Sequence, residues 1–406
     1  MDTRGYMTQF FDGVAIKKLS SVEASKAQSS NQHELNGTLP IQKLFGRPVD
    51  LQKINIPTRF YYLSDEDRFI PEKGTMCLYD ARAQGRLNGG ANRSEIRLYY
   101  PTNDVTQLWN TNDTLIIARV TGTLEACVIV AKAESAVEGE LLWLFDSSAP
   151  ESEKAFRTIE QATLQQASLP PGIDDLLSAL DIPVPRTEDY LDEMLYRFGT
   201  EFPATRIFSE FARQKSPYHS ALEADADTII DAWYEMEEQL YKTFEFHLLN
   251  QRIAQGFTPD TFLAEAKSVM NRRKSRAGQG LENHLEQLFI ERKIRYTRTP
   301  CTEAKSKPDF IFPGIKEYKD PSFDAVKLHM LGAKTSCKDR WRQVLVEADR
   351  IPNKHLITMD TIISTAQTDE MRAHNLQLVI PASRHARYSE EQRLWLFSVE
   401  DFIKVL

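Results

Sequence analysis

Residues 331–351 read LGAKTSCKDRWRQVLVEADRI and predict a buried strand that leads into an amphipathic helix. The apolar start ends at Lys334, where the chain becomes densely charged. RWRQVLVEADRI then has helical periodicity, and it carries Glu347 thirteen residues after the lysine. A strand that leads into a helix is typical of an α/β domain.

The surrounding segments extend this prediction to a domain built on a central mixed sheet. Helices are expected at 226–256, at 258–278 and at 280–293, the second with a start signal at Thr258 and Pro259 and a stop signal at Gly278. Strands are expected at PDFIFPG (308–314), VKLHMLGAKTSC (326–337), NKHLITM (353–359) and LQLVIPAS (376–383).

The first part of the chain is predicted to be mainly β. DTLIIARVT (113–121) and EACVIVAKA (125–133) are β-branched runs separated by GTL, which predicts a hairpin, and RSEIRLYYP (93–101) reads as another strand. EKAFRTIEQATLQQA (153–167) is expected to form a helix, and the proline-rich zone 168–186 a linker. The expected division is a first domain at 1–170, a linker at 171–186 and a second domain at 187–406.

Composition agrees with an ordinary globular protein of two domains. The chain has 406 residues, of which 41% are hydrophobic and 27% charged. It has no apolar run of the roughly 18 residues that a membrane span needs, and no signal-peptide core near its start, so a cytoplasmic protein without a membrane partner is expected. The four cysteines lack metal-ligand spacing and are read as reduced thiols.

Charge argues in two directions about nucleic acid. The formal net charge of −8 disfavours it, but residues 267–307 hold eleven Lys and Arg against four Glu. The basic run in this segment contains Arg272, Arg273, Lys274 and Arg276. Such a run indicates a phosphate-binding patch, and its alternative is a solvated helix end.

Three polar residues of the second half suggest phosphodiester chemistry. Asp309 follows Pro308 at a strand start, Lys334 lies 25 residues later on the next strand, and Glu347 follows on the helix. Two converging carboxylates could hold Mg²⁺, and a lysine beside them could position water next to a phosphate. Glu282 could add a further acid. Each residue type is also common at such positions without any site.

The segments PDF, AKTSCKDRWRQ and the following E, with NRRKSRAGQGLENHLEQLF (271–289) upstream, resemble EcoRII-type restriction endonucleases. These form a branch of the PD-(D/E)xK nuclease fold, and the resemblance covers most of 200–385. It implies Asp309 and Glu347 as Mg²⁺ ligands, Lys334 as the catalytic lysine and Glu282 as a helix carboxylate. The generic pattern has an acid two residues before the lysine, where this chain has Gly332. In this branch the missing carboxylate comes from the helix, and Glu347 provides it.

Lys338, Asp339 and Arg340 could read G·C pairs beside the cutting residues. Arg and Lys can donate to guanine, and Asp can accept from cytosine. The alternative is a salt-bridged helix start, although two cations there would oppose the helix dipole. The resembled family reads outer C·G pairs of CC-x-GG sites at this position, so a CCWGG-like site is expected. Trp233 is expected in the core, or as a surface on which a flipped base stacks, since some relatives use base flipping.

The first part resembles the N-terminal effector domain of the same enzymes, through GVAIKKLSSVEASKAQSSNQHELNG (13–37) and GGANRSEIRLYYP (89–101). That domain is a B3-like pseudobarrel that grips DNA between two arms. The resemblance implies DNA contacts in one arm from Lys18, Ser29, Ser30, Asn31, Gln32, His33 and Glu34, and in the other from Asn92, Arg93, Ser94, Glu95 and Arg97. For His33 the alternative is a structural histidine.

The expected function is therefore that of a type II restriction endonuclease, Mg²⁺-dependent and acting on double-stranded DNA in a bacterial or archaeal cytoplasm. The resemblance allows a homodimer and implies a cognate DNA methyltransferase that protects host DNA without direct contact. The alternatives are a DNA-binding regulator with an inert nuclease half, and a repair nuclease that recognises DNA structure.

Overall fold

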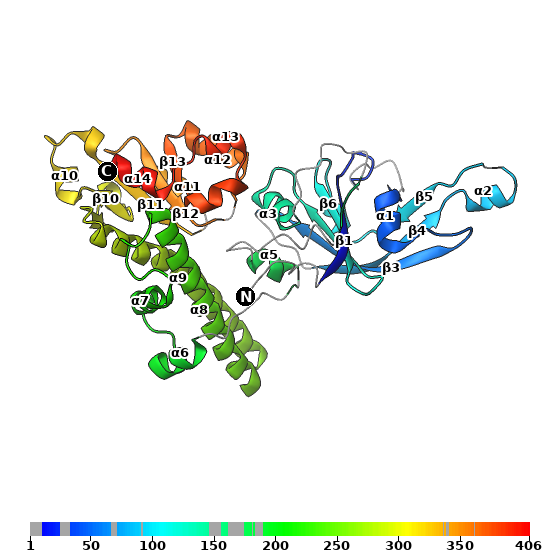
Figure 1. The fold of residues 1–406 in the computed structure, drawn as a ribbon, viewed down its shortest axis with the longest axis horizontal. Coiled ribbons are helices and arrows are strands. Elements are labelled where there is room, and N and C mark those ends of the chain that lie inside the picture. The colour runs from blue at the N-terminus through cyan, green and yellow to red at the C-terminus, as the bar shows by residue number, and fades with distance from the viewer. Residues whose placement is uncertain are drawn as a thin grey trace. The chain divides into compact units, whose positions relative to one another are not determined.

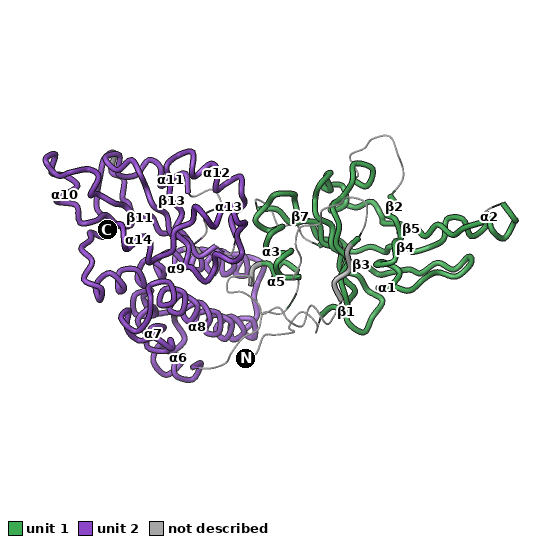
Figure 2. The backbone as a smooth tube through the Cα atoms, turned by 45° about the horizontal axis from the view of Figure 1, so that its top comes forward, with its two compact units in different colours: residues 1–184 green, residues 185–406 purple. Residues whose placement is uncertain are grey.

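The computed structural model describes residues 10–24, 33–65, 71–90, 92–145, 156–160, 174–180, 182, 190–335, 337, 341–360 and 362–406. The chain divides into two compact units, residues 1–184 and 185–406 (Figure 2). Each unit has hydrophobic clusters of its own. Among the described residues no helix is both long and apolar enough to span a bilayer.

Unit 1 is built on an eight-stranded mixed sheet in the order β2-β5-β4-β3-β7-β6-β1-β8, of which Figure 1 labels β1, β3, β4, β5 and β6. Among the strands that the structure describes here, only β3 and β7 pair in parallel. The strands are β1 (Phe11–Lys18), β2 (Glu34–Asn36), β3 (Lys53–Leu63), β4 (Glu72–Asp80), β5 (Ile96–Tyr99), β6 (Thr114–Val120), β7 (Ala126–Ala131) and β8 (Arg157–Glu160). The helices are α1 (Leu39–Phe45), α2 (Ala83–Leu87), the 3₁₀ turn η2 (Thr106–Leu108), α3 (Ala136–Leu144) and α5 (Asp174–Ala179).

The predicted hairpin is confirmed, because β6 and β7 pair antiparallel, with Thr114 opposite Ala131. Alternate residues of β6 belong to different cores: Ile116 packs into one cluster, and Leu115 and Ile117 into the other. A strand that is covered on both faces needs a continuous apolar run. This requirement explains why residues 115–118 are apolar at every position and not at every second one.

The helix predicted over 153–167 is wrong where the structure describes it, because residues 157–160 form strand β8. This strand pairs antiparallel with β1, with Gly13 opposite Glu160 and Ile16 opposite Arg157. On its other side β1 pairs with β6, so the backbone groups of its free edge need a partner. Pairing with this edge overrides the weak helical pattern of the segment.

The chain around the unit boundary differs from a plain linker. Helix α5 lies inside the segment expected to link the domains, and the boundary falls after residue 184. Leu176, Leu177, Leu180 and Ile182 are all buried in the same cluster as β1, β6 and β7. The four apolar side chains therefore complete the core of unit 1.

A fragment that ends at residue 170 is expected to be much less stable than one that ends at residue 184. Burial of each of the four apolar side chains contributes about 1.5–3 kcal/mol, and a domain typically has about 5–15 kcal/mol in total. Urea unfolding of the two fragments measures the difference. Equal midpoints would show that the segment containing α5 does not stabilise unit 1.

Unit 2 contains a five-stranded mixed sheet in the order β13-β12-β11-β10-β9. The strands are β9 (Thr297–Arg298), β10 (Phe310–Phe312), β11 (His329–Lys334), β12 (Lys354–Thr358) and β13 (Leu376–Val379). The helices are α6 (Leu191–Phe198), α7 (Thr205–Lys215), α8 (Ala226–Gln255), α9 (Pro259–Glu291), α10 (Ile315–Lys319), α11 (Trp341–Leu345), α12 (Thr365–Ala373), α13 (Glu390–Arg393) and α14 (Val399–Val405), with 3₁₀ turns η3 (Glu303–Lys305), η4 (Ala325–Lys327) and η5 (Ala382–Arg387).

Helices cover both faces of this sheet, as an α/β domain requires. Phe310, Leu331 and Ile357 pack with α8, α9 and α14 on one face. Ile311, Met330 and Leu356 pack with α11 and α12 on the other face. β11 pairs in parallel with β12 and antiparallel with β10, so the predicted mixed sheet is confirmed.

The helix expected to stop at Gly278 instead continues as α9 to Glu291. Its predicted start is correct, because Thr258 caps the helix and Pro259 is its first residue. A Cβ at Gly280 would lie 2.6 Å from Oε1 of Glu237 on α8. The glycine therefore allows close packing of α9 against α8. This packing keeps the chain helical across glycines that would weaken an isolated helix.

Candidate active site

Asp309 and Lys334 meet in unit 2 where the start of β10 lies beside the end of β11, at one end of the strands of the sheet. Because β10 and β11 are antiparallel, with Phe310 opposite Leu331, the start of β10 lies beside the end of β11. Oδ2 of Asp309 accepts hydrogen bonds from the Ala333 backbone N–H at 2.7 Å and from Lys334 Nζ at 2.8 Å. Both side chains are largely but not wholly buried. The pair is thus held in place while still reachable from solvent.

Glu347 faces the same point, but not from a helix as expected. Helix α11 ends at Leu345, and Glu347 follows in the next turn, where its carbonyl accepts from Lys354 Nζ. Its Oε2 is buried and has no hydrogen-bond partner within the described part of the chain. Burial, and then the charge of Asp309, raise the pKa of Glu347 to about 7. A carboxylate so placed needs a proton or a cation.

Glu282 on α9 belongs to the same electrostatic cluster. Burial, and then the charge of Asp309, raise its pKa, whereas Arg298 and Lys334 lower it. Burial alone would lower the pKa of Lys334, but Asp309, Glu347 and Glu282 together raise it. The lysine is therefore a protonated, charged group among three acids.

Arg298 was not singled out from the sequence, where its only signal is the basic segment 267–307. It lies on β9, and its guanidinium donates to Glu282 at 3.0 Å, to Glu286 at 2.7 Å and to Asn283 at 3.0 Å. It therefore holds the Glu282 side chain on the surface of α9.

The donors at this edge of the sheet fit a magnesium ion better than a metal with a closed protein shell. No group of three acidic, histidine or cysteine side chains among the described residues is arranged to hold a metal. Mg²⁺ commonly uses only one or two carboxylates, and takes its other oxygens from water and phosphate. The unpartnered Oε2 of Glu347 and the carboxylate of Asp309 meet this smaller requirement.

Trp233 belongs to the core, which was one of its two expected roles. Its side chain is fully buried and packs with Leu281 and Leu285 of α9. Its Nε1 donates to the Tyr218 carbonyl at 2.7 Å. A base therefore cannot stack on this ring in the folded unit, and the stacking role is corrected.

Arg276 is a second correction, because it is buried between α8 and α9 and cannot reach DNA. It forms ion pairs with Glu237 at 3.4 Å and with Glu238, and its guanidinium lies 3.9 Å from the centre of the Tyr241 ring. The charge count over 267–307 missed these glutamates because they lie on another helix.

The rest of the basic run is less enclosed. Arg273 donates to Glu245 at 2.8 Å but keeps 57% of its side chain exposed. Arg272 lies over the Phe202 ring at 5.1 Å. The structure does not describe the side chain of Lys274, nor does it describe residues Lys338, Asp339 and Arg340.

In unit 1 the structure describes only part of the first predicted arm. Ser29, Ser30, Asn31 and Gln32 lie outside the described residues. Lys18 forms an ion pair with Glu138 of α3 and is therefore held within the unit. His33 lies within 3.0 Å of the Thr102 hydroxyl and packs edge-on against Tyr100, and Glu34 accepts from the Tyr79 hydroxyl.

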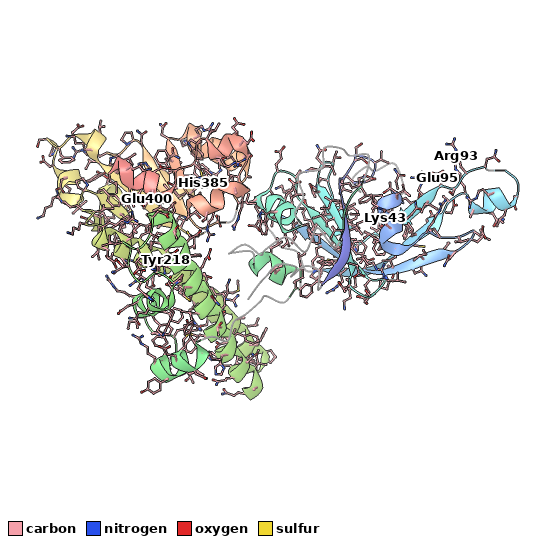
Figure 3. All side chains as sticks on the ribbon, viewed as in Figure 1. Lys43, Arg93, Glu95, Tyr218, His385 and Glu400 are labelled. Atoms are coloured by element: carbon pink, nitrogen blue, oxygen red, sulfur yellow. The ribbon has the colours of Figure 1, made fainter. Side chains whose placement is uncertain are left out.

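The second predicted arm lies beside the end of the first. β2 and β5 pair antiparallel, with Asn36 opposite Arg97, whose guanidinium donates to the Asn36 side chain at 2.8 Å. Glu95 pairs with Arg97 and with Arg82, and Ser94 accepts from Arg47 at 3.0 Å. Asn92 and Arg93 are exposed, and Arg93 and Glu95 lie close together toward the α2 end of the unit (Figure 3).

An acid before one strand and a lysine at the end of the next are the arrangement that the resemblance to PD-(D/E)xK nucleases implied, and the second acid, Glu347, lies just beyond the helix on which it was expected. Residues 241–403 match the family model described as EcoRII C terminal. It is similar to the type II restriction enzyme EcoRII of Escherichia coli, with 49% identity over 164 residues, 40% of each protein. The match thus spans about two fifths of the length of that relative.

Two solved structures are also similar to this chain. One is metal-depleted Ecl18kI in complex with uncleaved, modified DNA, with 18% identity, a TM-score of 0.44, and coverage of 54% of this chain and 84% of that one. The other is a complex of restriction endonuclease PspGI with substrate DNA, with 16% identity, a TM-score of 0.40, and coverage of 50% of this chain and 91% of that one.

Proposed function

We propose that the protein is a type II restriction endonuclease that hydrolyses double-stranded DNA at a specific site and requires Mg²⁺. The observation that carries the proposal is the convergence of Asp309, Lys334 and Glu347 at one edge of the sheet. It is supported by the EcoRII family match over residues 241–403, which include all three residues.

Asp309 and Glu347 would hold the metal, which when bound neutralises phosphate charge and makes its water more acidic. Lys334 has a raised pKa, so it remains an ammonium ion that can donate a hydrogen bond to a phosphate oxygen or to the attacking water. The Ala333 N–H fixes the Asp309 carboxylate against β11. Arg298 restrains Glu282 on the α9 side of the cluster, where it can accept a hydrogen bond from water.

Cleavage of plasmid DNA with Mg²⁺ tests this function against its two alternatives. Discrete bands support a restriction endonuclease. Binding without any cleavage would indicate a DNA-binding regulator with an inert nuclease half, and cleavage only at lesions would indicate a repair nuclease. Retention of both acids and the lysine favours the first outcome over the second.

The proposed site is CCWGG-like, read by Lys338, Asp339 and Arg340 beside the catalytic lysine. Unit 1 would act as a B3-like DNA-binding domain through the region where β2 pairs with β5. Arg93, Glu95 and Arg97 in this region would contact DNA. A homodimer would read a symmetric site, and a cognate methyltransferase would protect host DNA. The 49% identity to a type II restriction enzyme supports the nuclease half of this assignment.

Sequence discrimination is expected to depend on Arg340 and general affinity on Lys274. Arg340→Ala should lose about 1–3 kcal/mol of discrimination at one guanine, the usual value of a bidentate base contact. Lys274→Ala should weaken binding to all sequences and flatten its salt dependence. Oligonucleotides changed at each position of the site separate the two effects. An equal loss on every sequence for both variants would mean that residues 338–340 contact only the backbone.

Metal affinity is expected to depend on pH through Glu347. Its pKa of about 7 means that a proton competes with the metal below that pH. Affinity for Mg²⁺ should therefore rise roughly tenfold per pH unit up to about pH 7 and then level off. Without metal, the stability from this raised pKa is present in acid and is lost as the pH rises through about 7. Calorimetric titrations across pH measure the trend, which Glu347→Gln should flatten.

A further inference from the structure

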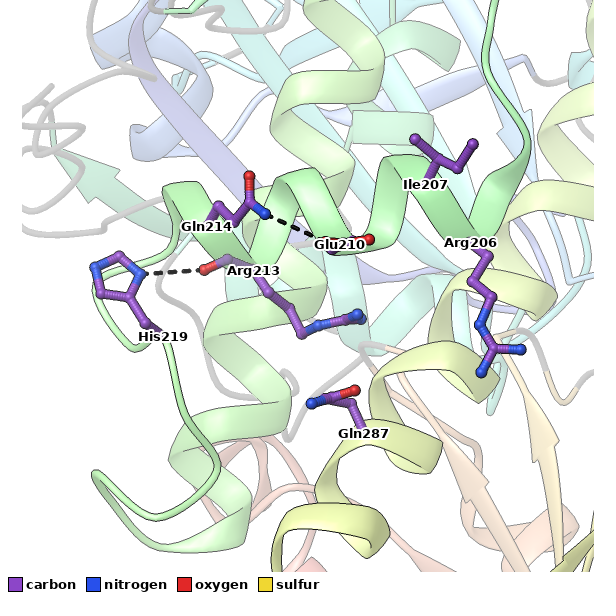
Figure 4. Close-up of a pocket in the computed structure, with 7 residues that line it drawn as sticks. All are labelled: Arg206, Ile207, Glu210, Arg213, Gln214, His219 and Gln287. Atoms are coloured by element: carbon purple, nitrogen blue, oxygen red, sulfur yellow. Dashed lines mark hydrogen bonds between the residues drawn. The ribbon is translucent and has the colours of Figure 1, made fainter.

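A hollow of about 540 Å³ lies between α7, the turn that follows it, and α9 (Figure 4). This volume is typical of small-ligand sites. Arg206 and Arg213 of α7 project toward α9, which carries Gln287, and Nδ1 of His219 lies 3.4 Å from the Arg213 carbonyl oxygen (Figure 4). The lining is therefore rich in hydrogen-bond donors and carries two guanidinium groups.

Arg213 is partly buried and faces the hollow without a carboxylate of the described residues in direct contact. Of the arginines near it, Arg276, Arg292 and Arg298 each pair with a carboxylate, whereas no ion pair of Arg213 occurs in the part of the chain that the structure describes. One of its terminal nitrogens lies 3.4 Å from Nδ1 of His284, and its guanidinium lies 5.7 Å from the centre of the Trp233 ring. Apart from this contact with His284, no hydrogen bond of its five N–H donors occurs among the described residues.

The charge of Arg213 is only partly compensated. Burial lowers its pKa, Glu237, Glu210 and Glu291 act in the opposite direction, and Arg206 lowers it further as a like charge. Arg206 forms an ion pair with Glu286 at 2.8 Å, and the Gln287 side chain donates a hydrogen bond to Glu291 at 2.6 Å. Partial burial of a permanent cation without a carboxylate partner is unfavourable, and an anion in the hollow would offset this cost.

We propose that this hollow binds an oxyanion of the phosphate class, held by the guanidinium of Arg213 with Arg206 at its rim. The planar fork of an arginine matches two oxygens of a phosphate, and a neighbouring guanidinium adds charge without a second binding step. Glu210 in the lining disfavours highly charged polyphosphates, so a single phosphate group is the expected ligand. The ligand could be free phosphate or a backbone phosphate of DNA.

Calorimetric titration of the full chain with inorganic phosphate, in a buffer free of phosphate, sulfate and metal, tests the site. The wild type should bind one phosphate, and Arg213→Gln should bind at least about tenfold more weakly. Arg213→Lys keeps the charge but loses the fork, so its affinity should lie between these two. Arg206→Gln should lose a few-fold. Arg295→Gln is the control matched to Arg206→Gln, because Arg295 is as exposed as Arg206 and also pairs with one carboxylate. This variant should bind phosphate as the wild type does.

Absence of phosphate binding in the wild type, or equal affinity in the wild type and both Arg213 variants, would overturn the proposal. Circular dichroism melts identify a variant that has lost its fold, and Arg213→Lys and Arg206→Gln then decide the outcome. A second titration in the presence of saturating duplex DNA without the target site identifies the source of the phosphate. Loss of phosphate binding means that the hollow takes a DNA phosphate, and unchanged binding means that it takes free phosphate. DNA cleavage is not measured, so the result is independent of the nuclease proposal.

Discussion

Lys334→Met is expected to reduce DNA cleavage by at least roughly a thousandfold, because removal of a preorganised charged donor from a reacting phosphate has effects of this order. Asp309→Asn and Glu347→Gln should be equally severe, since each removes a charge from the candidate Mg²⁺ site. The three variants should keep the wild-type fold, because each replacement is close in size to the original side chain and Lys334 and Asp309 lie at strand ends that remain open to solvent. Single-turnover cleavage of a plasmid measures the loss.

Two matched variants control for nonspecific effects. Lys327→Met removes a lysine on the exposed turn before β11, and Asp349→Asn removes an exposed carboxylate two residues after Glu347. Both should cleave at nearly the wild-type rate. Near-normal cleavage by Glu347→Gln would mean that the second carboxylate of the site is another residue, and Glu282 would then be the first to test.

Arg276→Met is expected to destabilise unit 2 by about 3–5 kcal/mol, the usual cost of breaking a buried ion pair from one side. The substitution removes an ion-pair partner from the buried Glu237, which keeps His284 at 2.9 Å and a hydrogen bond with Ser209, and it removes the guanidinium from the Tyr241 ring. The salt dependence of DNA binding should not change, because Arg276 is enclosed within the protein. Chemical unfolding and a salt titration of DNA binding measure the two effects.

Arg252→Met is the control for this prediction. Arg252 pairs with Glu265 across the same two helices, but its side chain is 43% exposed. An exposed pair contributes about 0–1 kcal/mol, so this variant should be nearly as stable as the wild type. If Arg276→Met kept the wild-type stability but reduced the salt dependence of DNA binding, Arg276 would have to contact DNA after all.

Local patterns of the sequence were sufficient for several elements of the fold. The cap at Thr258, the apolar runs at 113–121 and 125–133, and the strand that ends at Lys334 depend on residues close together in the chain. The motif PDF and the lysine 25 residues later also predicted that Asp309 and Lys334 belong to one site. Their direct hydrogen bond agrees with this prediction, although the catalytic role itself remains to be tested.

The errors arose where distant segments decide the outcome. Residues 157–160 became a strand because β1 has a free edge, and α9 passes through Gly278 and Gly280 because α8 packs closely against it. Arg276 and Trp233 are enclosed by α8, α9 and their neighbours, which a basic run or a lone tryptophan cannot reveal. The hydrogen bond from Arg298 to Glu282 depends on where β9 lies beside α9, which the local sequence does not show.

The sequence by itself thus determined the class of each unit, the order of the acids and the lysine, and the EcoRII resemblance of the second half. It could do so because hydrophobic periodicity and motif spacing are local properties of a chain. Only the tertiary structure decided which charges are free and which are paired. The reason is physical: whether Arg213, Arg276 or Glu347 meets water, a carboxylate or no partner depends on side chains that lie far away in sequence and are brought within a few ångströms by packing.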